Sequence, residues 1–328
     1  MQAIQRIYSK DEETAVEVLE EFIRNNERSD FLVSSDFIPT LVSDNHSGLI
    51  ANTIAESSDP KLFVQYFDKF RSWLKSDDFQ TRTNALICIG NIVCSDEVAC
   101  SLISNDLIEE IRSLCASEHI KEQHAALSTL KNFAIPKENK SELASESMIR
   151  TIENCMTRSP AVSLQAIGLL RLICAEHEHT KKLSTSFVHS IAEIFHSSEH
   201  EGLKSESARV LALCVKGNSK FVLDSLVPSQ LYLINSEHEM LRMEGLLSMF
   251  IFASNDVIID SFLPLVSSLL RRENSEAVIS NLVSVLLLLS QRNRLNFSSD
   301  QVEEILYLLS SFKDEKIEIL LDVLRPLN

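Results

Sequence analysis

The fold of this chain is decided by the stretch Gln80-Thr-Arg-Thr-Asn-Ala-Leu-Ile-Cys-Ile-Gly-Asn91-Ile-Val, which has a second copy in Gln123-His-Ala-Ala-Leu-Ser-Thr-Leu-Lys-Asn132-Phe-Ala. In each copy, small residues and leucines recur along one face of a helix, and that face ends on an asparagine. The two asparagines lie 41 positions apart. A period of roughly 40 residues is typical of helical repeat proteins of the armadillo or HEAT type. The block between residues 79 and 140 therefore predicts an all-α fold, an armadillo/HEAT-type right-handed superhelical solenoid.

The same helix face recurs along most of the chain. Its equivalent positions are spaced by 39, 41, 40, 42, 37 and 36 residues, and they are Asn52, Asn91, Asn132, Leu172, Cys214, Ile251 and Leu287. Turn-forming residues such as Asp59-Pro60 separate the repeats. We therefore predict one armadillo-repeat domain over residues 1–328, with a cap or partial repeat at 1–27, about seven repeats at 28–293 and capping helices at 294–328.

The composition supports a helical core and an acidic surface. Hydrophobic residues make up 45% of the 328 residues, and only 6 Gly and 7 Pro are present, too few for a turn-rich β protein. The formal net charge is −16, and residues 1–60 hold 12 acids against 4 bases. Such a field repels nucleic acid and anionic membranes and attracts a basic partner. A purely solubilising surface is the alternative interpretation.

The cysteines and the longest apolar segment both favour a soluble protein of a reducing compartment. The seven cysteines form no C-x-x-C pair, and most lie in apolar helical runs. The apolar run Val283–Leu289 is ended by polar residues too early to span a membrane, so we expect a buried helix there. The prediction is a monomeric cytoplasmic protein without membrane insertion, and a nuclear pool is left open.

Asn52, Asn91 and Asn132 are the candidate binding residues that the repeat pattern itself provides. The last helix of each armadillo repeat is expected to line a concave groove, so the three amides should form a row along it. An amide offers one acceptor and two donors, and can therefore bond both the C=O and the N–H of an extended peptide. The alternative is that these asparagines bond loop carbonyls of the adjacent repeat.

No enzyme motif emerges. The chain has no G-x-S-x-G sequence, no phosphate-binding glycine loop and no nucleotide-binding fingerprint. The H-x-x-E-H pattern at His196–His200 is expected in a loop between repeats, whereas a zinc site of this type needs a single helix. The pair His177 and His179 is also expected in a loop and lacks convergent ligands. We predict no catalytic residue, no metal and no cofactor.

The segment Gln123 to Asn132 continues as Phe-Ala-Ile-Pro136-Lys-Glu-Asn139-Lys140, and in this form it closely resembles the smgGDS family. Members of that family are armadillo-repeat guanine-nucleotide dissociation stimulators of Ras- and Rho-family small GTPases. Gly90–Asp96 resembles the preceding repeat of the family, and further similar segments follow in order, so that the resemblance covers about residues 60–255. Two of these segments are Gly168-Leu-Leu-Arg171-Leu-Ile and Glu206-Ser-Ala-Arg209-Val-Leu.

The resemblance implies a non-catalytic protein that binds a small GTPase with a polybasic, prenylated C-terminal tail. It would promote GDP release or act as a chaperone. The expected groove contacts are Asn52, Asn91, Gln123, His124, Asn132, Asn139 and Arg209. Charge complementarity suggests acidic N-terminal residues as contacts of the basic tail: Asp36, Asp44, Glu56, Asp59, Asp77 and Asp78.

Two departures from the family pattern leave an alternative function open. Family members are roughly twice as long, so the resemblance implies that this chain corresponds to a half without the prenyl-binding region. Ala208 stands where the family has an asparagine. The alternative is an armadillo scaffold that grips an extended peptide of a basic partner without exchange activity.

Overall fold

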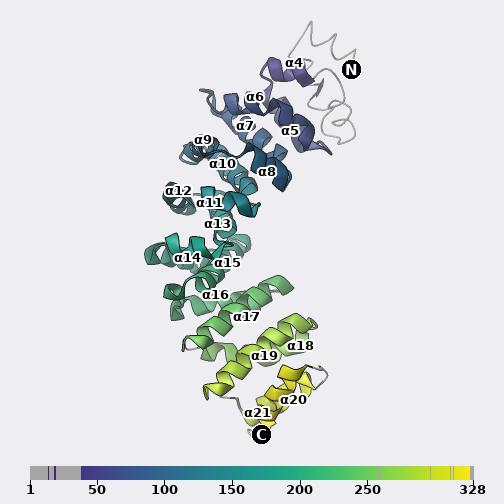
Figure 1. Cartoon of the computed structure of the whole chain (residues 1–328), viewed down its shortest axis with the longest axis vertical. Helices are drawn as coiled ribbons and strands as arrows, with labels where there is room; N and C mark the ends of the chain where they lie inside the picture. Colours follow the sequence, from purple (N-terminus) through teal and green to yellow (C-terminus); the bar gives the residue numbers. More distant parts are fainter. Residues whose placement is uncertain are drawn as a thin grey trace. The chain divides into compact units, whose positions relative to one another are not determined.

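The computed structural model describes residues 38–325 except 258, 296, 311 and 313, together with Thr14, Val18 and Leu19. Within these residues all regular secondary structure is helical (Figure 1). The all-α class predicted from the sequence is therefore confirmed. Most of the predicted cap at 1–27 lies outside the described residues. The chain divides into two compact units, Met1–Ile173 and Cys174–Asn328, and each is described by itself.

The first unit is built from a series of long helices with shorter helices between them. The long helices α5, α7, α10 and α13 contain the equivalent positions Asn52, Asn91, Asn132 and Leu172. Helix α7 packs between α5 and α10. The elements, in order, are α4 (Ile38–Ser43), α5 (Ser47–Ala55), η1 (Pro60–Tyr66), α6 (Phe67–Trp73), α7 (Phe79–Ile92), α8 (Asp96–Leu102), α9 (Asn105–Leu114), α10 (Ile120–Phe133), η2 (Lys137–Asn139), α11 (Lys140–Leu143), α12 (Glu146–Met156) and α13 (Pro160–Cys174).

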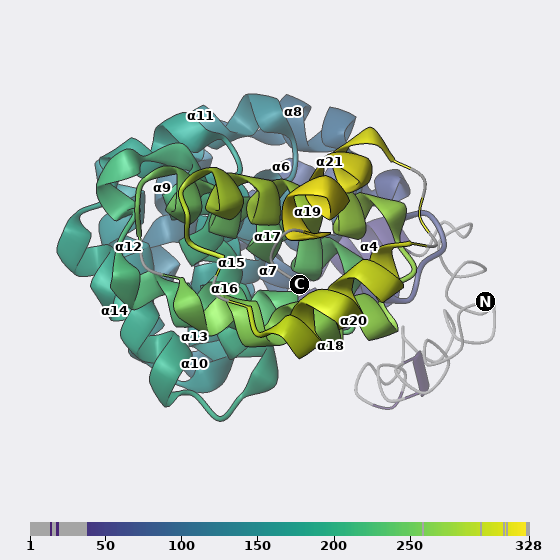
Figure 2. The same cartoon turned by 90° about the horizontal axis from the view of Figure 1, so that it is seen from below.

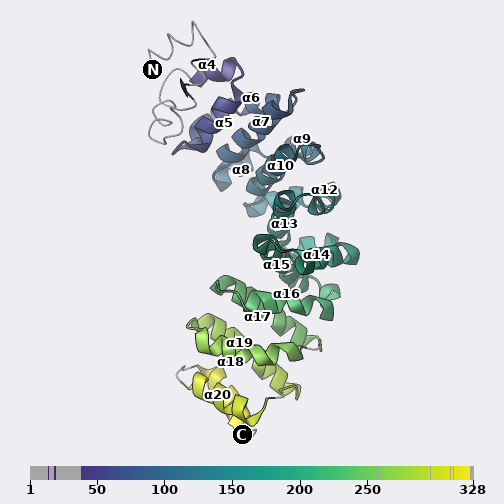
Figure 3. The ribbon, with the colours of Figure 1, turned by 180° about the vertical axis from the view of Figure 1, so that it is seen from behind.

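The short helices of this unit flank the long ones on different sides. Helices α9 and α12 lie on one side of α10 and α8 lies on the other, in both side views (Figures 1 and 3). Figure 2 shows α8 and α11 together at one edge. The long helices thus keep one face that is covered neither by α9 and α12 nor by α8.

Polar residues placed between the apolar runs fix where the helices of the first unit begin. The Asp78 carboxylate accepts hydrogen bonds from the backbone N–H groups of Gln80 and Thr81, and thereby caps α7. Ser95 and Ser104 cap α8 and α9 in the same way. Each cap satisfies N–H groups that have no partner inside the helix, which sets the first residue of the helix.

Buried arginine–glutamate pairs join successive repeats in both units. The Arg82 guanidinium donates two hydrogen bonds to Glu122, at 2.6 and 3.2 Å, and also bonds the carbonyls of Ser76 and Asp77. In the second unit, Arg242 bonds Glu273 at 2.5 and 3.1 Å and two carbonyls at the same offsets along the chain. The two units therefore use the same arginine–glutamate interaction to connect a long helix to the next repeat.

The second unit continues the pattern with α15, α17 and α19 as its long helices. The apolar run Val283–Leu289 forms part of α19, and its positions 283, 285, 286 and 289 are buried. The elements are η3 (His177–Lys182), α14 (Thr185–Ser197), α15 (Glu201–Gly217), η4 (Ser219–Phe221), η5 (Asp224–Leu226), α16 (Val227–Ile234), α17 (Glu239–Ser254), η6 (Asp260–Phe262), α18 (Leu263–Arg272), α19 (Glu276–Gln291), α20 (Ser299–Leu309) and α21 (Glu315–Leu324). Among the described helices, none is long and apolar enough to cross a membrane.

The two histidine motifs differ partly from the loops that the sequence predicts. His196 lies in the last turn of α14, and His200 is the N-cap of α15, its Nδ1 accepting from the Leu203 N–H at 3.2 Å. His177 and His179 lie in the 3-10 helix η3, and His179 is buried. The loop assignment was wrong for His177, His179 and His196, which lie in helical turns, whereas His200 directly precedes α15. No three His, Cys, Asp or Glu side chains of the described residues cluster as metal ligands would.

Candidate functional site

A groove of about 750 Å³ lies over the long helices α5, α7, α10 and α13 of the first unit. It runs along the two sequence copies from which the repeat was predicted. Most of its lining consists of amides, hydroxyls and small or branched apolar side chains. The lining residues are Asn52, Gln80, Thr83, Asn84, Leu86, Ile87, Gly90, Asn91, Ile120, Lys121, His124, Ala125, Ser128, Thr129, Asn132 and Ala161.

The three predicted asparagines all line this groove. Asn132 donates from Nδ2 to the Gly90 carbonyl oxygen at 2.8 Å, across to the helix of the preceding repeat. Asn91 donates from Nδ2 to the Ile87 carbonyl of its own helix at 3.0 Å. Each bond uses one amide hydrogen and leaves the amide oxygen and the second hydrogen for a partner. The alternative interpretation, a bond to a loop carbonyl of the adjacent repeat, is thus met only in part. Asn132 does reach the adjacent repeat, but the carbonyl that it bonds belongs to helix α7.

Close packing between α7 and α10 at Gly90 makes the Asn132 bond possible. The Thr129 hydroxyl donates to the Leu86 carbonyl at 2.8 Å, and it also lies within hydrogen-bond distance of the Ala125 carbonyl of its own helix, at 2.9 Å. A methyl group at Gly90 would lie 3.1 Å from the Thr129 hydroxyl oxygen, tighter than an ordinary contact. The absence of a side chain at this position therefore lets the two helices approach closely, and it leaves the glycine carbonyl open to Asn132.

His124 is held in the groove by a chain of hydrogen bonds that determines its protonation. Lys131 donates from Nζ to Gln165 Oε1 at 2.8 Å, so the Gln165 amide nitrogen faces His124 Nε2 at 3.1 Å. An NH₂ group only donates, so Nε2 accepts and the ring is neutral, with its proton on Nδ1. Burial, and next the positive charge of Lys131, lower the pKa of His124 below 6.5, in agreement with this assignment.

Apolar side chains stand among the amides. Ile87 is 37% exposed and Ile120 is 56% exposed, and both line the groove. A second hollow of about 290 Å³ shares Gly90, Asn91 and Asn132 with the groove and continues it toward Ile135. Amides beside exposed isoleucines suit a partner main chain with apolar side chains between its polar groups.

Three other predicted groove contacts lie elsewhere. Gln123 and Asn139 are each 3% exposed, and they donate to the carbonyls of Ser117 at 2.6 Å and Phe133 at 3.0 Å. Arg209 belongs to the second unit and bonds Glu244 at 3.0 and 2.9 Å. These side chains stabilise the fold, and none lines the groove, so we do not keep them among the proposed groove contacts.

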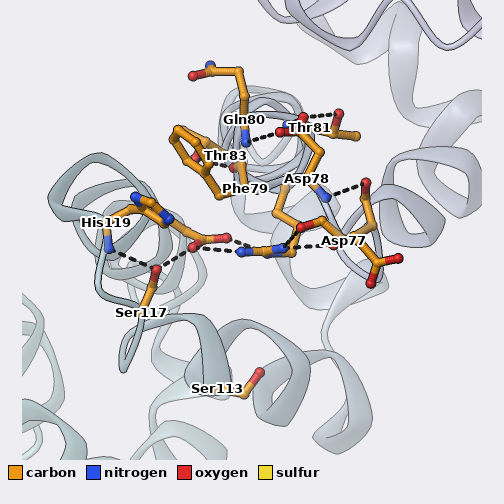
Figure 4. A network of polar contacts seen from close by, with 12 residues as sticks. Asp77, Asp78, Phe79, Gln80, Thr81, Thr83, Ser113, Ser117 and His119 are labelled. Carbon is orange, nitrogen blue, oxygen red and sulfur yellow. Dashed lines mark hydrogen bonds and ion pairs between the residues drawn. The ribbon is translucent and has the colours of Figure 1, made fainter.

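The predicted acidic residues lie outside the groove lining. Asp44, Asp59, Asp77 and Asp78 are exposed and Glu56 is half-buried, while Asp36 lies outside the described residues. Figure 4 shows Asp78 bonded to Gln80 and Thr81 at the start of α7, and Asp77 beside it. Hydrogen bonds from the Thr81 hydroxyl and backbone N–H lower the pKa of Asp78. The Asp78 carboxylate is thus both a helix cap and a surface charge.

Among the groove residues that the sequence analysis did not name, three could have been found from their spacing to a predicted asparagine. Gln80 and Asn84 precede Asn91 by 11 and 7 positions, which places all three on one face of α7. Lys121 precedes Asn132 by 11 positions on α10. Extending each face backwards from its asparagine would have found them.

Fold and groove together define an armadillo-type helical-repeat protein with an amide-lined groove. A scan against protein-family models finds no match to this chain. Among solved structures, an engineered protein aligns with a TM-score of 0.79 at 18% identity, covering 98% of this chain and 86% of that one. A designed armadillo repeat protein in complex with the peptide (KR)4 aligns at 0.57 and 17% identity, covering 67% and 98%. The predicted armadillo class is thus confirmed.

The curated relatives of this chain include GDP dissociation stimulators. Rap1 GTPase-GDP dissociation stimulators 1-B and 1-A of Xenopus laevis are each 26% identical over 220 residues, which is 61% of this chain and 36% of the relative. The GTPase-GDP dissociation stimulator vimar of Drosophila melanogaster is 26% identical over 156 residues, or 44% and 24%. These matches confirm the resemblance to dissociation stimulators, and they span about a third of the length of the first two relatives.

Proposed function

We propose that this chain binds a small GTPase through the groove of its first unit and promotes the release of GDP or chaperones the GTPase. The single observation that carries the proposal is the similarity to Rap1 GTPase-GDP dissociation stimulators over 61% of the chain. The groove supports it, since amides from adjacent repeats stand side by side there, two of them oriented by hydrogen bonds.

The proposed mechanism requires no catalytic side chain. A stimulator must bind the nucleotide-free or open form of the GTPase more tightly than the GDP-bound form, and its effect equals that difference in affinity. A tenfold faster release requires about 1.4 kcal/mol of transition-state preference. Asn52, Asn91 and Asn132 would bond the main chain of a segment that is accessible only when the GTPase opens.

The acidic surface outside the groove is the proposed contact of a polybasic C-terminal tail. Asp44, Asp59, Asp77 and Asp78 are exposed, and Glu56 is half-buried near them in sequence. Opposite charges of this kind mainly raise the association rate and select the partner, and salt screens them. This contact is independent of the groove amides, so the two can be tested separately.

The proposal is tested by release of labelled GDP from Rap, Ras and Rho proteins, each with and without its basic tail. We expect faster release for at least one GTPase, and a smaller effect in high salt or without the tail. If no GTPase of the panel binds or releases GDP faster, the proposed function is wrong.

An armadillo scaffold that grips an extended peptide is the second candidate function, and the open amide groups of the groove favour it. Such a scaffold would bind a partner peptide equally well in the presence of GDP, GTP or neither. Insensitivity to the nucleotide, combined with peptide affinity, would therefore select this second function.

A further inference from the structure

We propose that the groove receives an extended partner segment that carries acidic side chains, and that the basic tail binds elsewhere. The inference deepens the proposed function and rests on it for the kind of partner, a protein that presents an extended segment. It is carried by the way charge is divided between the groove helices and their neighbours.

The long helices of the first unit are almost free of carboxylates, although the chain as a whole has 47 acids and 31 bases. Helices α5, α7, α10 and α13 together carry four bases and one acid, Glu122. That acid is fully buried and bonded to Arg82. No carboxylate is found among the described residues that line the groove.

Three of the flanking helices carry most of the helical acids of this unit instead. Helices α8, α9 and α12 carry seven acids and two bases in fewer residues than the long helices. Random placement in a chain with this composition would give the long helices more acids than bases. The division therefore keeps negative charge off the groove face while α8, α9 and α12 stay acidic.

Positive charge is present where the carboxylates are missing. Lys121 is exposed and lines the groove. Lys131 lies ten positions further along α10. Its ammonium group donates to Gln165 and would lie 3.1 Å from a methyl group at Gly168 on α13. A basic peptide in the groove would meet Lys121 with no carboxylate of the lining to compensate it. An acidic peptide would gain charge-assisted hydrogen bonds.

The remaining lining also fits an extended acidic segment. The open amide groups of Asn52, Asn91 and Asn132 can bond a main chain without regard to its charge. Ile87 and Ile120 offer apolar contacts between the polar groups. A segment that carries both apolar and acidic side chains would thus find apolar partners in Ile87 and Ile120 and a cation in Lys121.

The test uses the full chain and three labelled peptides of equal length, rich in valine and threonine so that they stay extended. Their remaining positions carry Glu, Gln or Lys. The variant Lys121→Glu reverses the charge in the groove. Lys181→Glu makes the same change at an exposed position of η3 in the second unit and serves as the control.

We expect the Glu peptide to bind most tightly and the Lys peptide most weakly. Lys121→Glu should weaken binding of the Glu peptide by about fivefold to tenfold, with a smaller effect in high salt, and Lys181→Glu should change it less than about twofold. Tightest binding of the Lys peptide, or an unchanged affinity for the Glu peptide in Lys121→Glu, would overturn the inference.

The failure of this inference can be told apart from the failure of the proposed function. If the GTPase panel shows no binding while the Glu peptide binds in a Lys121-dependent way, the GTPase function fails and the charge preference of the groove stands. If GDP release is accelerated but an excess of Glu peptide neither binds nor slows it, the function stands and the inference fails.

Discussion

The side-chain amide of Asn132 donates to the carbonyl oxygen of Gly90 at 2.8 Å, and this bond crosses from one repeat to the preceding one. It orients an amide that also lines the groove. The same residue thus contributes to the packing of α7 against α10 and to the proposed binding surface. Its substitution should therefore change both stability and affinity.

Asn132→Ala should lower the free energy of unfolding by about 1 kcal/mol and weaken peptide or GTPase binding by about fivefold, because one internal bond and the remaining amide groups are lost. Asn154→Ala, at an exposed position of α12, is the matched control and should change neither quantity. Urea unfolding and fluorescence anisotropy measure the two effects. Normal affinity in Asn132→Ala would exclude this amide from the binding surface.

Arg82→Ala should destabilise the first unit strongly, by about 3 kcal/mol, because the fully buried Glu122 carboxylate would lose the guanidinium that compensates its charge and keep only the Ser117 hydroxyl bond. Arg150→Ala breaks the exposed Arg150–Glu146 pair and should cost less than about 0.5 kcal/mol. Chemical denaturation of both variants gives the comparison. Equal effects of the two substitutions would show that the burial of Glu122 does not control the strength of the pair.

The stability of the first unit should fall as the pH drops below about 6.5 through the titration of His124. Its pKa is lowered in the folded state, so the unfolded chain binds the proton first and unfolding is favoured once the pH falls below the unfolded value. The loss grows until the pH reaches the folded pKa and is constant below it. The difference in unfolding free energy between the wild type and His124→Gln, measured across this range, isolates the effect. A difference that does not change with pH would contradict the assignment of a neutral ring.

Two substitutions of Asp78 can separate its role as a helix cap from its proposed contact with a basic tail. Asp78→Asn removes the charge but keeps a good capping residue, so only affinity for a basic tail should fall. Asp78→Ala should also lower the denaturation midpoint, since the N–H groups of Gln80 and Thr81 lose their acceptor. Asp77→Asn is the comparison for charge alone, because no helix cap rests on its side chain. Unchanged tail affinity in both Asn variants would exclude these two acids from the tail contact.

The sequence was sufficient to predict the long helices of the first unit and the place of the groove. The period of the asparagines located the long helices, because burial of one helix face requires a regular spacing of apolar and small residues. Asn52, Asn91 and Asn132 fall on one groove as the helical period requires. The helix face on which each asparagine lies follows from the geometry of the α-helix alone.

Which of two adjacent polar residues faces the groove depends on packing that the sequence does not reveal. Successive positions on a helix are rotated by about 100°, so His124 lies in the groove whereas Gln123 is buried and bonds the Ser117 carbonyl. The resemblance suggested both as contacts. Asn139 was likewise suggested but caps the end of α10 from inside, bonding the Phe133 carbonyl. Only the three-dimensional packing distinguishes a polar residue that faces a partner from one that satisfies a buried carbonyl.

The rate of GDP release from Rap1 and related GTPases, measured with the wild type, Asn132→Ala and Asn154→Ala, tests the central claim most directly. The account predicts that the wild type and Asn154→Ala accelerate release equally and that Asn132→Ala is about fivefold weaker at subsaturating concentration. Acceleration that is unaffected by Asn132→Ala, or no acceleration of any GTPase by the wild type, would contradict it.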